Sequence, residues 1–157
     1  MRIRIVVASQ AEATFYDVQQ VGERLQVVGQ LTDPLAHLHD RDFKSDRPGR
    51  VFDHAPLASG RRGATAHHAT GGERRPREHE AALFAQKIAA ELEQARRNHR
   101  FDRLIVMAEP RFLGMLRKAL PDSLNSTVIA EVAKDLAQQP ESAVRAHVPI
   151  EAFQASP

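Results

Sequence analysis

The residues best suited to chemistry are arginines, and they are concentrated in one stretch. Between positions 41 and 77 the sequence has nine basic residues and four acidic residues, so this window carries a charge of +5 while the whole chain carries +2. A guanidinium group presents a planar fork of donors that matches phosphate and carboxylate oxygens. The candidate anion-binding residues are Arg47, Arg50, Arg61, Arg62, Arg74, Arg75 and Arg77.

Two aromatic residues flank the first of these arginines. Phe43 and Phe52 enclose the segment Asp46-Arg47-Pro48-Gly49-Arg50, whose residue types are typical of a tight turn. Their rings could stack on bases, as aromatic side chains do in proteins that bind single-stranded nucleic acid. They could equally pin the segment to the core while Asp46 pairs with a neighbouring arginine. Both interpretations stay open at this point.

Catalytic and metal-binding patterns are weak. Two-metal nucleases need several converging carboxylates, but the first eleven residues contain none, and Glu80 and Glu109 alone do not form a metal pair. His37, His39, His54, His67 and His68 lack the close helical spacing typical of a zinc site. There is no Gly-x-Ser-x-Gly elbow and no glycine-rich phosphate loop. We therefore expect no metal, no cofactor and no catalytic residues.

Length and composition restrict the class of protein. A chain of 157 residues with 42% hydrophobic and 27% charged residues is expected to form one domain over residues 1–157. It has no cysteine and no apolar run of the roughly 18 residues that cross a membrane. The opening residues are too short and too alternating for a secretory signal. These features predict a cytoplasmic protein without membrane insertion.

The N-terminal part of the chain predicts three strands joined by short connections. Ile3, Ile5 and Val7 alternate with other residues, which predicts a strand with one face on a core. Residues 13–18 and 25–31 are rich in β-favouring side chains. Short connections between strands require antiparallel pairing, so we expect a meander. From about residue 32 to residue 75 this pattern stops, and 44 residues with many Gly and Pro predict a long irregular loop.

The C-terminal part predicts helices alternating with strands. Pro76 favours a helix start, and Ala81, Phe84, Ile88 and Leu92 belong to an apolar stripe at helical spacing. The apolar run 104–108 predicts an interior parallel strand. A second helix is expected from Glu109-Pro110 to Pro121, a strand over 127–132, and a final helix within 140–153 that Pro149 breaks or kinks.

Together these elements predict an α/β protein. The order β-β-β-α-β-α-β-α, with right-handed crossovers, gives a mixed five-stranded sheet that has helices on its faces. This is the ribonuclease H-like connectivity.

Several segments, taken in order, resemble a known family, the bacterial host-attachment proteins, described as required for attachment to host cells. The residues that carry this resemblance are Ile5-Val6-Val7-Ala8, Asp40 to Phe52 including Ser45-Asp46-Arg47-Pro48-Gly49-Arg50, His79-Glu80, Phe84-Ala85, Phe101 to Val106, Ala108 to Arg117 including Phe112-Leu113-Gly114, and Glu131 to Leu136. The family is similar to the middle domain of archaeal and eukaryotic class-1 translation release factors. The resemblance thus implies the same ribonuclease H-like topology, while the family description names a phenotype and no chemistry.

The release-factor comparison also implies where a loop tip would lie. Those domains carry Gly-Gly-Gln just before the long first helix, and Gly71-Gly72-Glu73 occupies that position here. In release factors the glutamine helps to position water at the peptidyl-tRNA ester. A glutamate departs from this pattern because its charged carboxylate only accepts hydrogen bonds and is repelled by phosphates. Peptide release is therefore not expected, and a hydrolase acting at this tip is the lesser alternative.

The sequence favours a non-enzymatic binding domain. The expected partner is RNA, or another polyanion in a ribosomal or tRNA context, contacted by the arginine-rich segment. The alternative is a protein-interaction module in surface attachment or regulation, in which the same segment binds an acidic protein.

Overall fold

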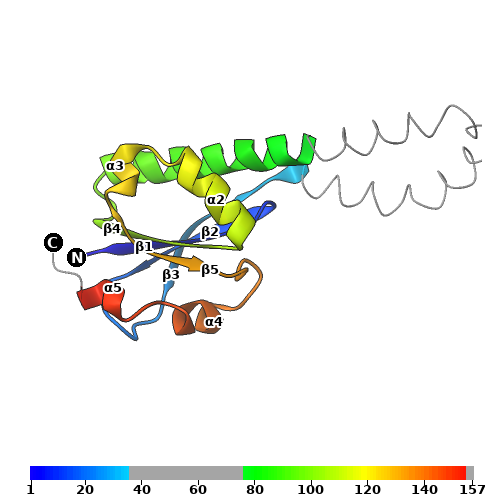
Figure 1. Cartoon of the computed structure of the whole chain (residues 1–157). Helices are drawn as coiled ribbons and strands as arrows, with labels where there is room; N and C mark the ends of the chain where they lie inside the picture. The colour runs from blue at the N-terminus through cyan, green and yellow to red at the C-terminus, as the bar shows by residue number, and fades with distance from the viewer. Residues whose placement is uncertain (36–75, 155–157) are drawn as a thin grey trace, which may run out of the picture.

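Five strands form one mixed sheet in the order β3-β2-β1-β4-β5 (Figure 1). The structure is a computed structural model that describes residues 1–35 and 76–154. The elements are β1 (Ile3–Ala8), β2 (Glu12–Val18), β3 (Gln26–Thr32), a long helix of residues 76–97, β4 (Arg103–Ala108), α2 (Pro110–Ala119), α3 (Asp122–Asn125), β5 (Val128–Ala133), α4 (Glu141–Ala146) and α5 (Glu151–Gln154).

The strand pairing confirms the predicted fold class. β1 and β2 pair antiparallel, as do β2 and β3, whereas β4 pairs parallel with both β1 and β5. The predicted meander and the two crossovers are therefore present, and the α/β fold is ribonuclease H-like. β4 lies between two parallel neighbours, which agrees with the prediction of an interior strand from its continuous apolar run.

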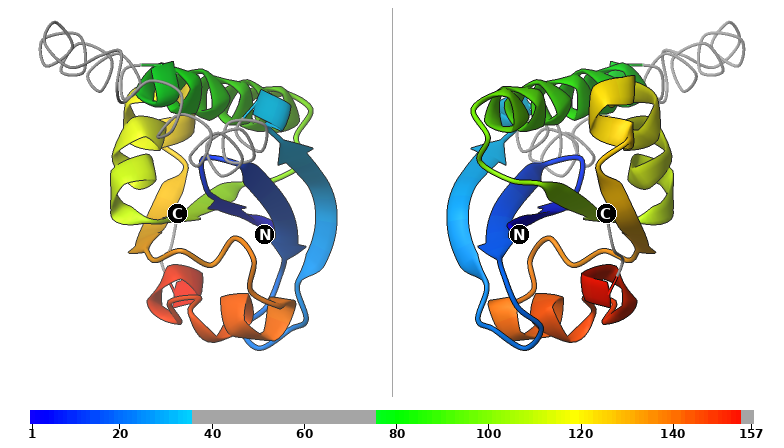
Figure 2. Two further views of the ribbon diagram at one scale, coloured as in Figure 1. Left: turned by 90° about the vertical axis from the view of Figure 1, so that its right-hand side faces the viewer. Right: turned by 90° about the vertical axis from the view of Figure 1, so that its left-hand side faces the viewer.

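Helices cover both faces of the sheet. The long helix, α2 and α3 lie on one face, and α4 and α5 lie on the other (Figures 1 and 2). Each face has its own apolar cluster, one centred on Phe84, Ile88 and Phe112 and the other on Ile5 and Ile105. Within the described residues, no helix is long and apolar enough to cross a membrane.

The prediction for β1 was wrong in one respect. All six residues of β1 are buried, so this central strand packs on both faces and not on one. Val6 and Ala8 join the cluster under the long helix, whereas Ile3, Ile5 and Val7 face α4 and α5. Arg4, which the alternation placed on a solvent face, is only 8% exposed. An arginine can occupy such a position when a carboxylate pairs with it, as Asp17 does here.

The two main helices confirm their predicted apolar stripes. Ala81, Phe84, Ile88 and Leu92 of the long helix are each at most 3% exposed. α2 begins at Pro110 and ends before Pro121, as expected. Pro76 is the first described residue of the long helix, so the predicted helix start at Pro76 is not tested by the described residues.

The C-terminal tail contains the predicted break. α4 and α5 are two short helices, with Pro149 between them and Val144 fully buried. The four-residue helix α3 was not predicted, because so short an element carries no hydrophobic period. β3 forms an edge of the sheet and leaves Val27 and Val28 exposed.

Candidate functional site at the carboxyl edge of the sheet

β1 and β4 end together at one edge of the sheet. They run parallel, and Ala8 lies opposite Ala108 in the register. In open α/β sheets, ligands bind outside the carboxyl ends of parallel strands, because the loops and helix starts that follow the strands meet there. We refer to this place as the carboxyl edge.

A tight turn after β1 fixes one side of the carboxyl edge. The Ser9 side-chain oxygen accepts hydrogen bonds from the amides of Ala11 and Glu12, each at 3.2 Å. These contacts hold Gln10 at the outside of the turn. The amide of Asp33 donates to the Ala11 carbonyl at 2.8 Å, so the chain also leaves β3 beside this turn.

The two helices that meet at this edge enclose a cavity of about 330 Å³. It is lined by Gln10, by three residues from the long helix and by two from α2, namely Arg77, Glu78, Ala81, Arg111 and Met115. A terminal nitrogen of Arg111 lies 3.5 Å from Oε1 of Glu78, and these side chains are 70% and 53% exposed. Arg111 thus pairs with Glu78 and Arg77 lines the same cavity, so the lining has two arginines and one carboxylate.

Glu109 has a structural role at this edge. Its side chain accepts a hydrogen bond from the Phe112 amide at 2.7 Å and so caps the N-terminus of α2. The sequence predicts that the second helix starts at Glu109-Pro110, and the structure adds this capping contact. Within residues 1–35 and 76–154, no group of three or more acidic or histidine side chains is arranged to hold a metal ion.

The structure describes one of the predicted site residues. Arg77 is exposed and lines the carboxyl-edge cavity. The others lie outside the described residues, and these are the arginines Arg47, Arg50, Arg61, Arg62, Arg74 and Arg75, the aromatic residues Phe43 and Phe52, and the loop tip Gly71, Gly72 and Glu73. The histidines His37, His39, His54, His67 and His68 also lie outside this part of the chain.

Sequence reasoning missed Arg111 as part of this site. It lies in the first turn of α2, directly after the interior strand β4. A basic residue in that position is the available signal, because a helix that follows a parallel strand starts at the carboxyl edge. Its proximity to Arg77 and Glu78 depends on helix packing that the sequence pattern does not contain.

Comparisons with solved structures give a similar chain from the translation machinery. An archaeal translation termination factor, aRF1, matches with a TM-score of 0.49 and 14% sequence identity. The match covers 98% of the present chain and 37% of the termination factor, so the present chain spans little more than a third of that protein's length. Among curated proteins, no sequence match was found.

Sequence-family comparison gives a match over most of the chain. The model of a family described as "Protein required for attachment to host cells" matches residues 4–148. This range includes all five strands except Ile3, the first residue of β1, and it includes the carboxyl edge. The chain therefore belongs to the family of proteins required for attachment to host cells.

Proposed function

We propose that this protein is a non-enzymatic binding domain that engages RNA through its arginine-rich segment and the carboxyl edge. One observation supports this most directly. The described chain stops shortly after β3 and resumes at the start of the long helix, and these two ends lie side by side (Figures 1 and 2). Arg77 and Arg111, which line the carboxyl-edge cavity, are exposed. Positive charge on the folded body and positive charge in the segment then act on the same ligand.

The chemistry of the edge suits a phosphate backbone. The Arg111–Glu78 pair is mostly exposed, and such pairs contribute about 0–1 kcal/mol to stability. A phosphate can therefore replace Glu78 as the partner of Arg111 at little energetic cost. Each phosphate that is neutralised releases counterions, so RNA binding through these arginines must weaken as salt rises.

The test measures affinity for tRNA and for ribosomal RNA fragments by fluorescence anisotropy at several salt concentrations. With about five phosphates contacted, the logarithm of affinity should fall with the logarithm of salt at a slope of about −4. Replacing Arg61, Arg62, Arg74 and Arg75 with Gln should reduce both the affinity and the slope.

The matched control removes the same charge elsewhere. Arg24, Lys87, Lys118 and Lys134 are exposed, and none lines the carboxyl-edge cavity. Replacing these four with Gln should change the affinity much less than the first set. An affinity that does not depend on salt, or equal losses in the two quadruple variants, would overturn the proposal.

A second candidate function is a protein-interaction module that binds an acidic protein partner in surface attachment. The family description favours it, because attachment to host cells involves recognition by some partner. Pull-down from lysate with and without nuclease treatment separates the two. Recovery of ribosomal material that nuclease abolishes supports RNA binding, whereas nuclease-resistant recovery of an acidic protein supports the second candidate.

A further inference from the structure

A larger cavity lies at the opposite edge of the sheet, where the parallel strands begin. Its volume is about 680 Å³, and its walls come from the end of the long helix, the start of β4 and the connection from α3 to β5. We call it the amino-edge cavity. It is open to solvent over much of its extent, and its volume exceeds what a single inorganic ion needs.

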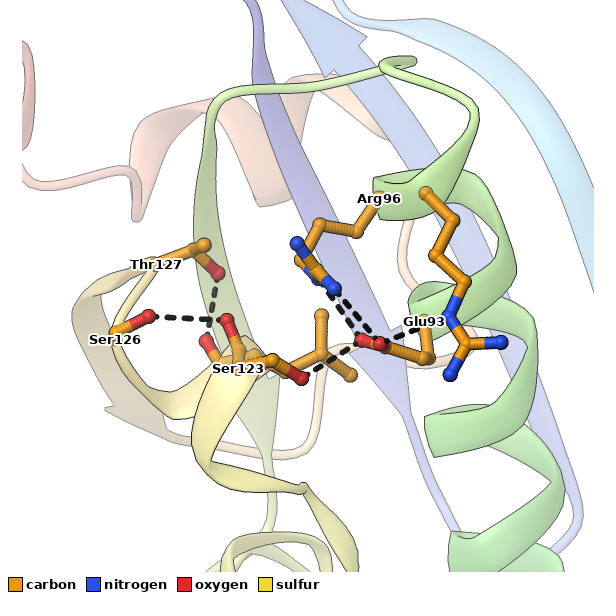
Figure 3. Close-up of polar contacts among 7 residues, drawn as sticks. Glu93, Arg96, Ser123, Ser126 and Thr127 are labelled. Atoms are coloured by element: carbon orange, nitrogen blue, oxygen red, sulfur yellow. Dashed lines mark hydrogen bonds and ion pairs between the residues drawn. The ribbon is translucent and has the colours of Figure 1, made fainter.

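Glu93 organises one wall of this cavity. Its carboxylate accepts two hydrogen bonds from Arg96, both at 2.9 Å, one from Arg97 at 3.2 Å and one from the Ser123 hydroxyl at 3.1 Å (Figure 3). The long helix and α3 are thereby joined, and the Arg96 guanidinium is held in one orientation. The bond to Arg96 lowers the pKa of Glu93 to about 2, so this carboxylate stays charged at neutral pH.

The lining carries more positive than negative charge. Arg96, Arg97 and Arg103 line it, and Asp102 is the carboxylate among the lining residues. Even with Glu93 counted against them, one positive charge remains uncompensated. The Arg97 side chain is 73% exposed, and within the described residues no ion pair to Arg103 is found. The Arg103 guanidinium and the terminal nitrogens of Arg97, whose Nε is bonded to Glu93, are thus available to a ligand.

Hydroxyl groups supply a second kind of contact. Ser126 donates to the Ser123 carbonyl at 3.0 Å, and Thr127 donates to the Leu124 carbonyl at 2.6 Å (Figure 3). Because each hydroxyl hydrogen is already used, the two oxygens can only accept further hydrogen bonds. Acceptors beside arginines match a molecule that has both a phosphate group and hydroxyl donors.

We propose that the amino-edge cavity binds a sugar phosphate or mononucleotide, with Arg97 and Arg103 on the phosphate and with Ser126 and Thr127 accepting from sugar hydroxyls. This site is separate from the carboxyl edge and does not depend on the proposed RNA binding. Cations near the end of a helix also interact favourably with its dipole, and that effect alone would explain Arg96 and Arg97. It does not explain Arg103, which belongs to β4, or a cavity of this size.

The test uses ribose 5-phosphate, inorganic phosphate and ribose as probes in amide NMR titrations of the full chain. Ribose 5-phosphate should bind saturably and shift amide signals of residues 99–103 and 123–127. Inorganic phosphate should bind the same residues more weakly, and ribose should not bind. Absence of saturable binding, or shifts centred on other residues, would overturn the site. Equal affinity for phosphate and ribose 5-phosphate would overturn the assignment of the hydroxyls.

Three variants assign the contacts. Arg103→Gln should weaken ribose 5-phosphate binding at least tenfold. Arg97→Gln should also weaken it, and because the Arg97 side chain is mostly exposed, this variant tests the site even if the Arg103 variant does not fold. Ser126→Ala should weaken binding of ribose 5-phosphate and leave binding of inorganic phosphate unchanged. Lys118→Gln, an exposed position outside the cavity lining, is the control and should bind as the parent does. Equal affinity of the Arg97 variant and the control would contradict the proposal.

Discussion

The guanidinium of Arg4 makes a two-point contact with the carboxylate of Asp17 across β1 and β2. Its Nε lies 2.7 Å from Oδ1 and its Nη2 lies 3.0 Å from Oδ2, and the two residues are directly opposite in the register. The same guanidinium carbon lies 5.2 Å from the centre of the Phe101 ring. The central strand therefore accommodates a cation because a carboxylate and an aromatic face both compensate its loss of water.

This pair predicts non-additive effects on stability. Asp17→Leu should leave the Arg4 charge without its partner and reduce the free energy of unfolding by about 2–4 kcal/mol, since the side chains of the pair are only 10% and 19% exposed. Arg4→Met with Asp17→Leu should recover to within about 1 kcal/mol of the parent, because no unpaired charge remains. Urea unfolding of the two single variants and the double variant gives the comparison. A double variant as unstable as the sum of the singles would show that the pair is not coupled.

The contacts of Glu93 predict that the free energy of unfolding decreases at low pH. The hydrogen bond from Arg96 lowers the pKa of Glu93 from 4.5 to about 2. A carboxyl group with a lowered pKa in the folded state stabilises the protein fully above the unfolded value, and this contribution is lost as the pH falls through the folded value. We expect Glu93→Gln to flatten the decline in stability between pH 4.5 and 2.

Urea unfolding at several pH values within that interval measures the effect. Glu91→Gln is the matched control, because it removes a carboxylate from an exposed position of the same helix. If the parent and the Glu93 variant lost stability in parallel over this interval, the hydrogen bonds to Glu93 would not be maintained in solution.

The raised pKa of Tyr16 predicts a loss of stability at high pH, whereas Glu93 predicts a loss at low pH. Burial raises its pKa above 10.0, and the negative charge of Glu141 adds to the effect. A tyrosine with a raised pKa contributes stability that is present below the unfolded value and lost as the pH rises above it. As it is the only tyrosine in the chain, tyrosinate absorbance reports it alone. Its titration midpoint should lie above 10.0 in the folded protein.

Glu141→Gln tests the second cause. The Glu141 side chain accepts a hydrogen bond from the Leu25 amide at 2.8 Å, and the carbonyl oxygen of Gln can accept the same bond. The variant should therefore remain folded and lower the midpoint slightly, while the larger effect of burial remains. A midpoint at or below 10.0 in the parent would contradict the burial of this ring.

Much of the fold follows from local patterns. The apolar run 104–108 identified an interior strand because both of its faces are covered, and the stripe through Phe84, Ile88 and Leu92 identified the face of the long helix that packs on the sheet. Such patterns report burial directly. Arg4 was misplaced because alternation alone predicts a solvent face, whereas the position opposite Asp17 is known only once the strand register is known.

The sites are less accessible to sequence reasoning. The amino-edge cavity joins Arg97 of the long helix, Arg103 of β4 and Thr127 of the connection before β5, which meet only through the crossovers between strands. The carboxyl edge likewise joins Arg77 with Arg111 from another helix. A high density of charge within one segment is visible in a sequence, so the arginines before the long helix were identified. Charged residues that are distant in sequence and close in the fold are not visible in this way, and Arg111 was therefore missed.

The proposed RNA binding predicts opposite effects for the two members of the Arg111–Glu78 pair. Arg111→Gln should weaken tRNA binding and reduce the steepness of the salt dependence by about 0.7–0.9, the contribution of one phosphate contact. Glu78→Gln should instead strengthen binding about two- to fivefold at low salt. In the proposed RNA complex this carboxylate would compete with phosphate for Arg111 and repel the RNA backbone, and an exposed pair of this kind is worth about 0.2–1 kcal/mol.

Salt titrations of both variants and of Glu91→Gln separate this local effect from a change in overall charge. Glu91→Gln changes the net charge by the same amount as Glu78→Gln. Both residues belong to the long helix, but Glu91 does not line the cavity, so its replacement should raise the affinity less. Equal gains from the two glutamate variants would mean that the RNA responds to the field of the whole molecule. A clear difference would mean that phosphate and Glu78 compete for one guanidinium, which requires the RNA to contact the carboxyl edge itself.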